Sequence, residues 1–210
     1  MKRFPPALSQ VLRFVALATI LVVPLAHADD YSTVSQLARS GKPAEALTKA
    51  DAYLATNPRD PQMRFIKGVI LTNTGKTQDA MAVFTQLTQD YPELPEPYNN
   101  LAVLYAAQGQ FEKARADLEM AVRANPGYTT AYENLGDVYA RLAAQSYAKA
   151  VQLDAAAGAS VTPKLTLIRS MFASSAKSQK PSAASAAMAF APASAAAAPA
   201  AGNSSSDQKP

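Results

Sequence analysis

The sequence predicts an all-α fold: a right-handed helix-turn-helix solenoid of about three and a half units, with a long final helix and a short capping helix. The main observation is a period of 34 residues, at which glycine, proline and alanine each recur three times. Glycine and proline mark helix ends, and the alanines keep a constant offset from both. The recurring residues are Gly41, Gly75 and Gly109, Pro58, Pro92 and Pro126, and Ala46, Ala80 and Ala114. Such a period with such markers is typical of stacked helical hairpins.

The N-terminal segment, residues 1–28, has the three-part layout of a secretory signal peptide. It starts with basic residues, continues with an apolar run over residues 14–26 and ends on small residues. The run covers 13 residues, whereas a membrane-spanning helix needs about 20. We therefore expect cleavage after Ala28 and a soluble, exported bacterial protein that is periplasmic or secreted. An uncleaved segment that anchors the protein in the inner membrane is the alternative.

Each complete unit of the solenoid, assigned to residues 29–160, is expected to be two antiparallel helices. Glycine ends the first helix, because it adopts a left-handed backbone at little cost, and proline stops the second. Pro61 and Pro97 are predicted at the first position of the helix that follows, where a missing N–H is no loss. Small residues are expected where helix axes approach closely, and on the first helices these are Gly68, Ala102 and Gly136.

These residues resemble the tetratricopeptide repeat (TPR) family. Its pattern of aromatic-x-x-Leu-Gly-x-x-Tyr is matched by Tyr132-x-x-Leu135-Gly136-x-x-Tyr139 and, with Ala for Gly, by Tyr98-x-x-Leu101-Ala102-x-x-Tyr105. Ala80-x-x-x-Phe84 supplies the second half of the pattern in the middle repeat. The resemblance implies the solenoid fold and places the four tyrosines of these motifs in the core.

The first repeat, roughly residues 31–58, is a degenerate copy of the pattern. Val34 stands at the usual glycine position, and Ala50 stands at the usual phenylalanine position. The two substitutions leave the helical hairpin itself as the expected structure.

The fourth unit departs from the period because its turn is missing. The turn glycine is expected near residue 143, where the sequence has Ala143, and no Gly, Pro or Asn occurs between Gly136 and Gly158. The end of the unit returns at residues 147–154, about five residues early. We predict one continuous helix from about Thr130 to Ala156, which extends on the order of 20 Å past the body.

A short amphipathic capping helix is predicted over residues 161–173, with Thr162 as N-cap and Pro163 at the first position. Its apolar stripe consists of Leu165, Ile168, Met171 and Phe172. We expect it to pack back on the overhanging fourth helix and cover the last apolar face of the solenoid. Residues 174–210 consist mainly of Ala, Ser and Pro and are predicted to be disordered.

In the TPR family, peptides bind along the concave face formed by the first helices. Transfer by position gives nine candidate groove residues: Phe65, Val69 and Thr72, then Asn99, Val103 and Ala106, then Glu133, Asp137 and Arg141. The family variant that grips a C-terminal carboxylate needs a Lys, Asn and Arg set that these positions lack. The predicted surface is an apolar patch beside an acidic rim, suited to a segment with an apolar anchor and a basic neighbour. The alternative is that Phe65 and Val69 pack beneath the first repeat.

Composition excludes several kinds of site. The 210-residue chain has a net charge of +4, but Lys2, Arg3 and Arg13 belong to the N-terminal segment, and the remainder carries 17 basic and 16 acidic residues. This balance gives no reason to expect a nucleic-acid surface. The chain has no cysteine, and its one histidine is His27. The processed protein therefore lacks the groups of cysteine nucleophiles, Ser-His-Asp triads and Cys/His zinc sites.

The sequence thus favours a non-catalytic scaffold of the bacterial cell envelope that binds another protein or a peptide segment in its groove. We expect no cofactor, no metal and no small-molecule substrate. One alternative is a structural homodimer that associates through the exposed fourth helix, which carries Leu142, Tyr147, Val151 and Leu153. Another, an enzyme with an unrecognised carboxylate site, is disfavoured because a solenoid offers helix faces rather than an enclosed cavity.

Overall fold

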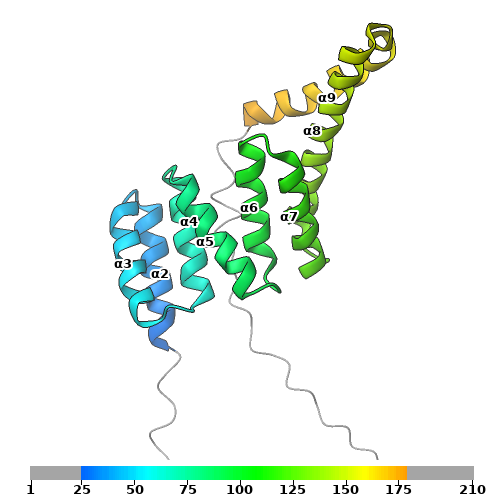
Figure 1. Ribbon diagram of the computed structural model, residues 1–210. Coiled ribbons are helices and arrows are strands. Elements are labelled where there is room, and N and C mark those ends of the chain that lie inside the picture. The colour runs from blue at the N-terminus through cyan, green and yellow to red at the C-terminus, as the bar shows by residue number, and fades with distance from the viewer. Residues whose placement is uncertain (1–24, 179–210) are drawn as a thin grey trace, which may run out of the picture.

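The computed structural model describes residues 25–178, with side-chain surroundings for residues 29–172. Over this range the chain is helical without strands, and the predicted all-α solenoid is confirmed (Figure 1). The elements are α2 (Leu25–Arg39), α3 (Pro43–Thr56), α4 (Pro61–Asn73), α5 (Thr77–Asp90), α6 (Pro95–Ala107), α7 (Phe111–Ala124), α8 (Thr129–Leu153), the 3-10 turn η1 (Ala155–Ala157) and α9 (Gly158–Ser178). Apart from residues 25–28, which belong to α2, the predicted signal peptide lies outside the described residues, as does the tail beyond residue 178.

The three hairpin turns are alike, as their common glycine predicts. Each glycine has a positive φ, of 79° at Gly41, 73° at Gly75 and 72° at Gly109. In each turn the next amide donates to a carbonyl five residues back, and the N···O distances are 3.0 Å for Lys42 to Leu37, 2.9 Å for Lys76 to Leu71 and 2.9 Å for Gln110 to Tyr105. These bonds satisfy carbonyls that the end of a helix leaves open.

Proline is the first residue of both α4 and α6, but in α6 it is not the predicted proline. Pro61 begins α4 after Asp60, whose carboxylate accepts from the Met63 amide at 2.7 Å. The helix α6 begins at Pro95, so Pro97 is its third residue, and the prediction for Pro97 is wrong. Pro95 has the fixed φ that suits the first position, so the helix starts two residues earlier.

Three buried clusters form the core, and each is shared by three consecutive helices. The first lies between α2, α3 and α4, the second between α4, α5 and α6, and the third between α6, α7 and α8. In the second cluster Gly68 is needed for space, because a Cβ built there would lie 2.7 Å from Cε1 of Phe84. The small residue on the first helix therefore admits a large one from the second.

A polar contact joins the first three helices at one edge. The Tyr31 hydroxyl donates to Oδ2 of Asp60 at 2.5 Å, and the Tyr53 hydroxyl donates to the same oxygen at 3.1 Å. Burial, together with the Asp60 carboxylate, raises the pKa of Tyr31 above its usual range. Asp60 thus caps α4 with one oxygen and ties α2 and α3 to it with the other.

The helix α8 runs without a turn for 25 residues, which confirms the predicted continuous helix. Figure 1 shows it extending beyond the body of the hairpins. It ends at Leu153 rather than near Ala156, because Asp154 takes an extended backbone and its side chain accepts from the Ala156 amide at 2.8 Å. The missing turn therefore removes the second helix of the fourth hairpin from its usual place.

The prediction that all four motif tyrosines are in the core is wrong for the two tyrosines of α8. Tyr98 is 7% exposed, whereas Tyr132 is 49% and Tyr139 is 48% exposed. Gly136 is also exposed, and a Cβ built there meets no atom within 4 Å. The reason is that no second helix within the described chain lies over this face of α8.

The capping helix is longer than predicted and starts earlier. The helix α9 has 21 residues and contains Pro163 in its interior, so Thr162 is not its N-cap and Pro163 is not its first residue. The helix continues directly from η1, which sets its direction before the proline is reached. It packs against α8, as expected. Among the described residues, no helix has the length and apolar character needed to span a membrane.

Candidate functional site

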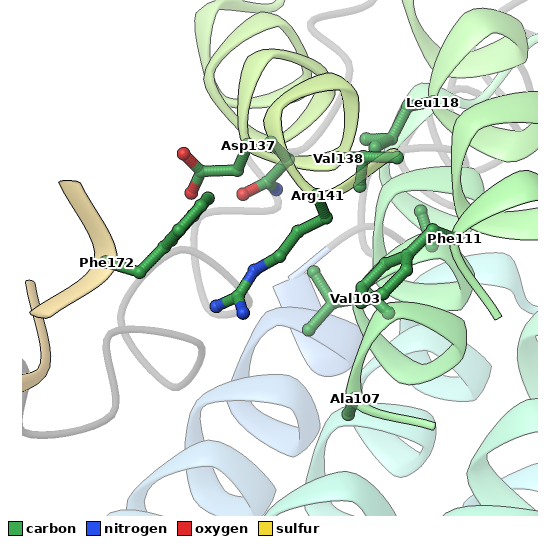
Figure 2. A pocket seen from close by; sticks show the side chains of 11 residues that line it. Val103, Ala107, Phe111, Leu118, Asp137, Val138, Arg141 and Phe172 are labelled. Atoms are coloured by element: carbon green, nitrogen blue, oxygen red, sulfur yellow. The ribbon is translucent and has the colours of Figure 1, made fainter. Parts of the chain in front are cut away.

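A groove of about 530 Å³ is bounded by α6, α7, α8 and the end of α9 (Figure 2). Its lining side chains come from four helices that the repeat packing brings together. They are Ala102, Val103, Ala106 and Ala107 of α6, Phe111 and Leu118 of α7, Asn134, Asp137, Val138 and Arg141 of α8, and Phe172 of α9.

Four of the nine predicted groove residues lie in this groove. The helical repeat explains their position, because residues three or four apart point to the same side of a helix. On α6 this side carries the apolar pair Val103 and Ala106, and on α8 it carries the charged pair Asp137 and Arg141. The charged residues are exposed and the apolar pair is half-buried.

The prediction that Phe65 and Val69 form an apolar patch in the groove is wrong. Each side chain is 2% exposed and belongs to the core cluster between α4, α5 and α6. The Phe65 ring lies against Phe84, with ring centroids 5.6 Å apart. These side chains fill the interior of the second hairpin and its contact with the third, so they offer no surface to a partner.

Three further predicted residues do not line the groove. Asn99 is 4% exposed, and its Oδ1 accepts from Nδ2 of Asn134 at 2.7 Å. Thr72 donates its hydroxyl to the Gly68 carbonyl at 3.0 Å. Glu133 is exposed on α8. Asn99 thus acts indirectly, by holding the groove residue Asn134 between α6 and α8.

Phe172 lines the groove although the sequence predicts another role for it. The sequence predicts it in the apolar stripe of a capping helix, but α9 reaches far enough back to place its ring at the mouth of the groove. The Arg141 guanidinium carbon lies 3.8 Å from the centroid of this ring. Such a cation–π contact is worth about 0.5–1 kcal/mol at exposed sites. The pair lines the side of the groove nearest α9.

The chemistry of the groove suits recognition rather than reaction. Its floor is apolar, made by Val103, Phe111, Leu118 and Val138, and its edge carries one carboxylate and one guanidinium. Within residues 29–172, no three Asp, Glu, His or Cys side chains gather to hold a metal ion. An apolar side chain would be desolvated on the floor, while Asn134, Asp137 and Arg141 present polar groups to a neighbouring backbone or charge.

Two carboxyl groups with raised pKa values lie outside the groove lining. Burial raises the pKa of Asp117 on α7 to about 6, and burial also raises the pKa of Glu96 on α6. One oxygen of each group is buried without a hydrogen-bond partner within the described part of the chain. Their effect is on stability, because a buried carboxylate without a partner disfavours the charged form.

The family models that match the chain describe one family. Residues 33–95 and residues 71–142 each match a model of the tetratricopeptide repeat, and together they span more than half of the chain. The chain is 46% identical over 50 residues to the tetratricopeptide repeat domain-containing protein PYG7, chloroplastic, of Arabidopsis thaliana. That match covers 24% of this chain and 17% of the relative, so the chain spans less than a fifth of the relative's length.

Two solved structures share the fold. The thermophilic TPR protein TTC0263 of Thermus thermophilus superposes with a TM-score of 0.51 at 23% identity, over 69% of this chain and 82% of that one. The type III secretion chaperone SycD of Yersinia enterocolitica, in complex with a peptide of the translocator YopD, gives a TM-score of 0.51 at 15% identity. That likeness covers 57% of this chain and 96% of the chaperone.

Proposed function

The chain belongs to the tetratricopeptide repeat family, and on this basis we propose that it is a non-catalytic scaffold that binds a segment of another protein in the groove between α6, α8 and α9. The observation that carries the proposal is the groove itself, which has an apolar floor and a polar edge and lies mainly on α6 and α8, the first helices of the third and fourth repeats. The solved SycD complex is an example of this fold together with a peptide.

The groove defines the kind of segment that fits. Its apolar floor takes one or two apolar side chains, and such buried anchors supply most of the affinity of a small interface. Arg141 and Asp137 at the edge favour a charged neighbour of either sign beside the anchor. Phe172 lines the side of the groove nearest α9, so we expect the segment to lie along α6 and α8.

The proposed partner is another protein of the bacterial cell envelope. Support comes from residues 1–28, whose basic start, short apolar run and small-residue end have the form of an export signal. A fusion of residues 1–28 to a reporter that is active only after export tests this part. Cleavage after Ala28, read by N-terminal sequencing of the exported chain, is the expected result.

Site-specific photocrosslinking in living cells tests the groove. A photoreactive residue replaces Val103 or Ala106, which line the groove, and in the control it replaces Gln86, an exposed residue of α5 that lies outside the groove. We expect one partner to be captured from both groove positions and not from Gln86. Equal capture from all three positions would contradict binding in the groove.

A further inference from the structure

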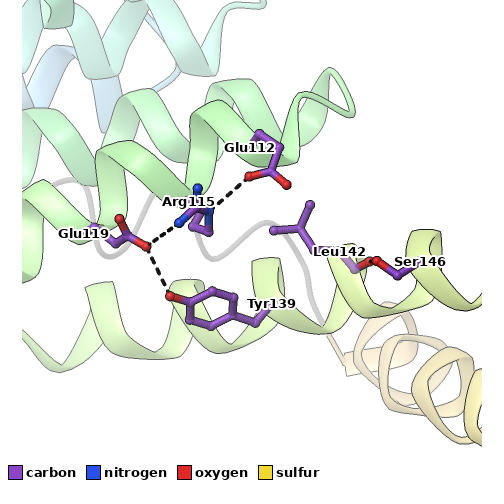
Figure 3. A network of polar contacts seen from close by, with 6 residues as sticks. All are labelled: Glu112, Arg115, Glu119, Tyr139, Leu142 and Ser146. Atoms are coloured by element: carbon purple, nitrogen blue, oxygen red, sulfur yellow. Dashed lines mark hydrogen bonds and ion pairs between the residues drawn. The ribbon is translucent and has the colours of Figure 1, made fainter.

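One face of α8 has no covering helix within the described chain, although its residue pattern is that of a covered face. Tyr132, Gly136 and Tyr139 repeat the pattern of Tyr98, Ala102 and Tyr105 on α6. On α6 this face packs against α7, so that Tyr98 is 7% and Ala102 is 1% exposed. On α8 both tyrosines are about half exposed. The Tyr139 hydroxyl reaches only the edge of α7, where it donates to Glu119 at 3.2 Å (Figure 3).

No side chain in the described part of the chain packs closely enough on Gly136 to require a glycine there. A glycine in a helix interior costs about 1 kcal/mol relative to alanine, and a Cβ here would meet nothing within 4 Å. Gly68, at the same repeat position, is explained by the Phe84 ring that lies against it. The sequence of α8 therefore keeps a space for a large side chain that residues 29–172 do not supply.

The second half of α8 is the helix that normally covers this face. Ala143, Tyr147 and Ala150 have the spacing of Ala114, Leu118 and Ala121, which α7 packs against α6. The two helices also end alike. Asn125 follows α7 and accepts from the amide two residues on at 2.9 Å, and Asp154 follows α8 and does so at 2.8 Å. Residues 143–153 are thus the second helix of the fourth unit, joined to the first without a turn.

The side-chain sizes at facing positions of the two helices identify which residues of the fourth unit would pack together. Gly68 faces Phe84 in the second unit, and the period places Val34 with Ala50 in the first unit and Ala102 with Leu118 in the third. Each pair combines a smaller residue with a larger one, whichever helix carries the larger. In the fourth unit the corresponding pair is Gly136 with Tyr147.

Gly136 and Tyr147 cannot meet within one chain. They are separated by three turns of one helix, or on the order of 16 Å, and so they lie on the same face. We propose that two copies of this chain place their α8 helices antiparallel about a two-fold axis, so that Tyr147 of each copy packs on Gly136 of the other. Each copy then supplies the second helix of the other's fourth unit, which is an exchange of identical elements.

The proposed interface is separate from the groove. Asp137 and Arg141 of α8 line the groove, whereas Tyr132, Gly136 and Tyr139 do not. Tyr147 is half-buried, with Nζ of Lys164 in α9 5.6 Å from its ring centroid. The expectation of a dimer through Leu142 is corrected, because Leu142 packs against the core cluster of α6, α7 and α8.

Variants of Gly136 and Tyr147 test the proposal. The measurement is sedimentation equilibrium of the purified full chain. We expect a dimer whose dissociation constant rises by at least about tenfold in Gly136→Val, because the new side chain takes the space of the tyrosine ring. Helicity by circular dichroism should be retained, since a Cβ at this position is unopposed in the isolated chain. The double variant Gly136→Val/Tyr147→Ala reproduces the pairing of Val34 with Ala50 and should restore the dimer.

Crosslinking gives the geometry independently, because the chain has no cysteine of its own. Ala143→Cys lies near the proposed two-fold axis and should form a covalent dimer with a short bifunctional maleimide. Gln145→Cys, exposed on the same helix but pointing away from the face, is the matched control and should not. A monomeric wild-type chain, or a dimer that Gly136→Val leaves intact, would overturn the proposal.

Discussion

Asp60 is a single residue that holds three helices together. One oxygen caps α4 through the Met63 amide, and the other accepts hydroxyl protons from Tyr31 and Tyr53 on the two preceding helices. Because Asn is as good an N-cap as Asp, Asp60→Asn keeps the cap and removes a charged acceptor from the two hydroxyls.

We expect Asp60→Asn to lower the free energy of unfolding by about 1.5–3 kcal/mol, the range for hydrogen bonds to charged groups. Tyr31→Phe removes one of the two hydroxyls and should cost less, about 1 kcal/mol. Urea unfolding followed by circular dichroism measures both. Equal costs for the two variants would show that Tyr53 gains nothing from Asp60.

The close approach of Gly68 to Phe84 gives a second prediction at this scale. Gly68→Ala places a Cβ 2.7 Å from the ring, and overpacking of this kind costs about 1–3 kcal/mol, against a gain of about 1 kcal/mol in helix propensity. The net effect should be destabilising. Gly68→Ala/Phe84→Leu copies the Ala102 and Leu118 pair of the next unit and should recover stability relative to the single variant. A single variant more stable than wild type would contradict the close contact.

Asp117 predicts a dependence of stability on pH. Burial raises its pKa from 3.8 in the unfolded chain to about 6, so the folded state holds a proton that the unfolded state loses between these values. The stabilisation is therefore complete below about pH 4 and is lost as the pH rises through about 6. After allowance for solvent screening it amounts to about 1–2 kcal/mol.

The measurement is the difference in unfolding free energy between Asp117→Asn and wild type. This difference should shift in favour of the variant between pH 4 and pH 7, because Asn does not ionise. Glu96, whose pKa burial also raises, is present in both proteins and cancels. A difference that stays constant with pH would show that the Asp117 carboxyl is solvated.

At the scale of the element, the missing turn determines where the second half of α8 packs. Insertion of five residues that begin with glycine between Leu142 and Ala143 restores the spacing of the other hairpins, in which the turn glycine lies five residues before an alanine. The second half of α8 should then fold back on Tyr132, Gly136 and Tyr139 of its own chain. We expect the inserted chain to be monomeric by sedimentation, with the helicity of wild type.

The matched control is an insertion of five helix-forming residues at the same place. It lengthens α8 and rotates its two halves relative to one another, so it should not bury the two tyrosines. Tyrosine exposure, read by solvent-perturbation absorbance, should be lower in the chain with the turn insertion than in the chain with the helical insertion. A lower exposure in the chain with the helical insertion would show that residues 143–153 do not pack on the face of Tyr132, Gly136 and Tyr139.

Sequence reasoning succeeds where a residue acts within its own helix or turn. The glycine turns, the proline stops and the uninterrupted α8 all follow from local backbone preferences. It fails at Pro97 and Pro163, because two acceptable helix starts lie close together and the sequence does not rank them. Helix starts depend on which turn the neighbouring elements allow, and that is a tertiary property.

At the scale of the whole molecule, the groove is predictable only in part. Val103, Ala106, Asp137 and Arg141 follow from the repeat register, which fixes the side of the helix that each occupies. Phe65 fails because its side chain packs against Phe84 of its own hairpin, in the core cluster shared with α6, so it is buried rather than exposed in the groove. Phe172 belongs to the groove only because of the length and direction of α9.

The pairing of volumes across the hairpins also affects how the chain reaches its native order. In a repeat protein every second helix resembles every other, so a helix can dock in the wrong unit during folding and trap the chain. Here the native partners differ: valine meets alanine, glycine meets phenylalanine, and alanine meets leucine. If Phe84 docked on Val34, two large side chains would collide, and if Ala50 docked on Gly68, a void would remain. The units are therefore not interchangeable, and the alternating volumes select the native stacking order against shifted ones.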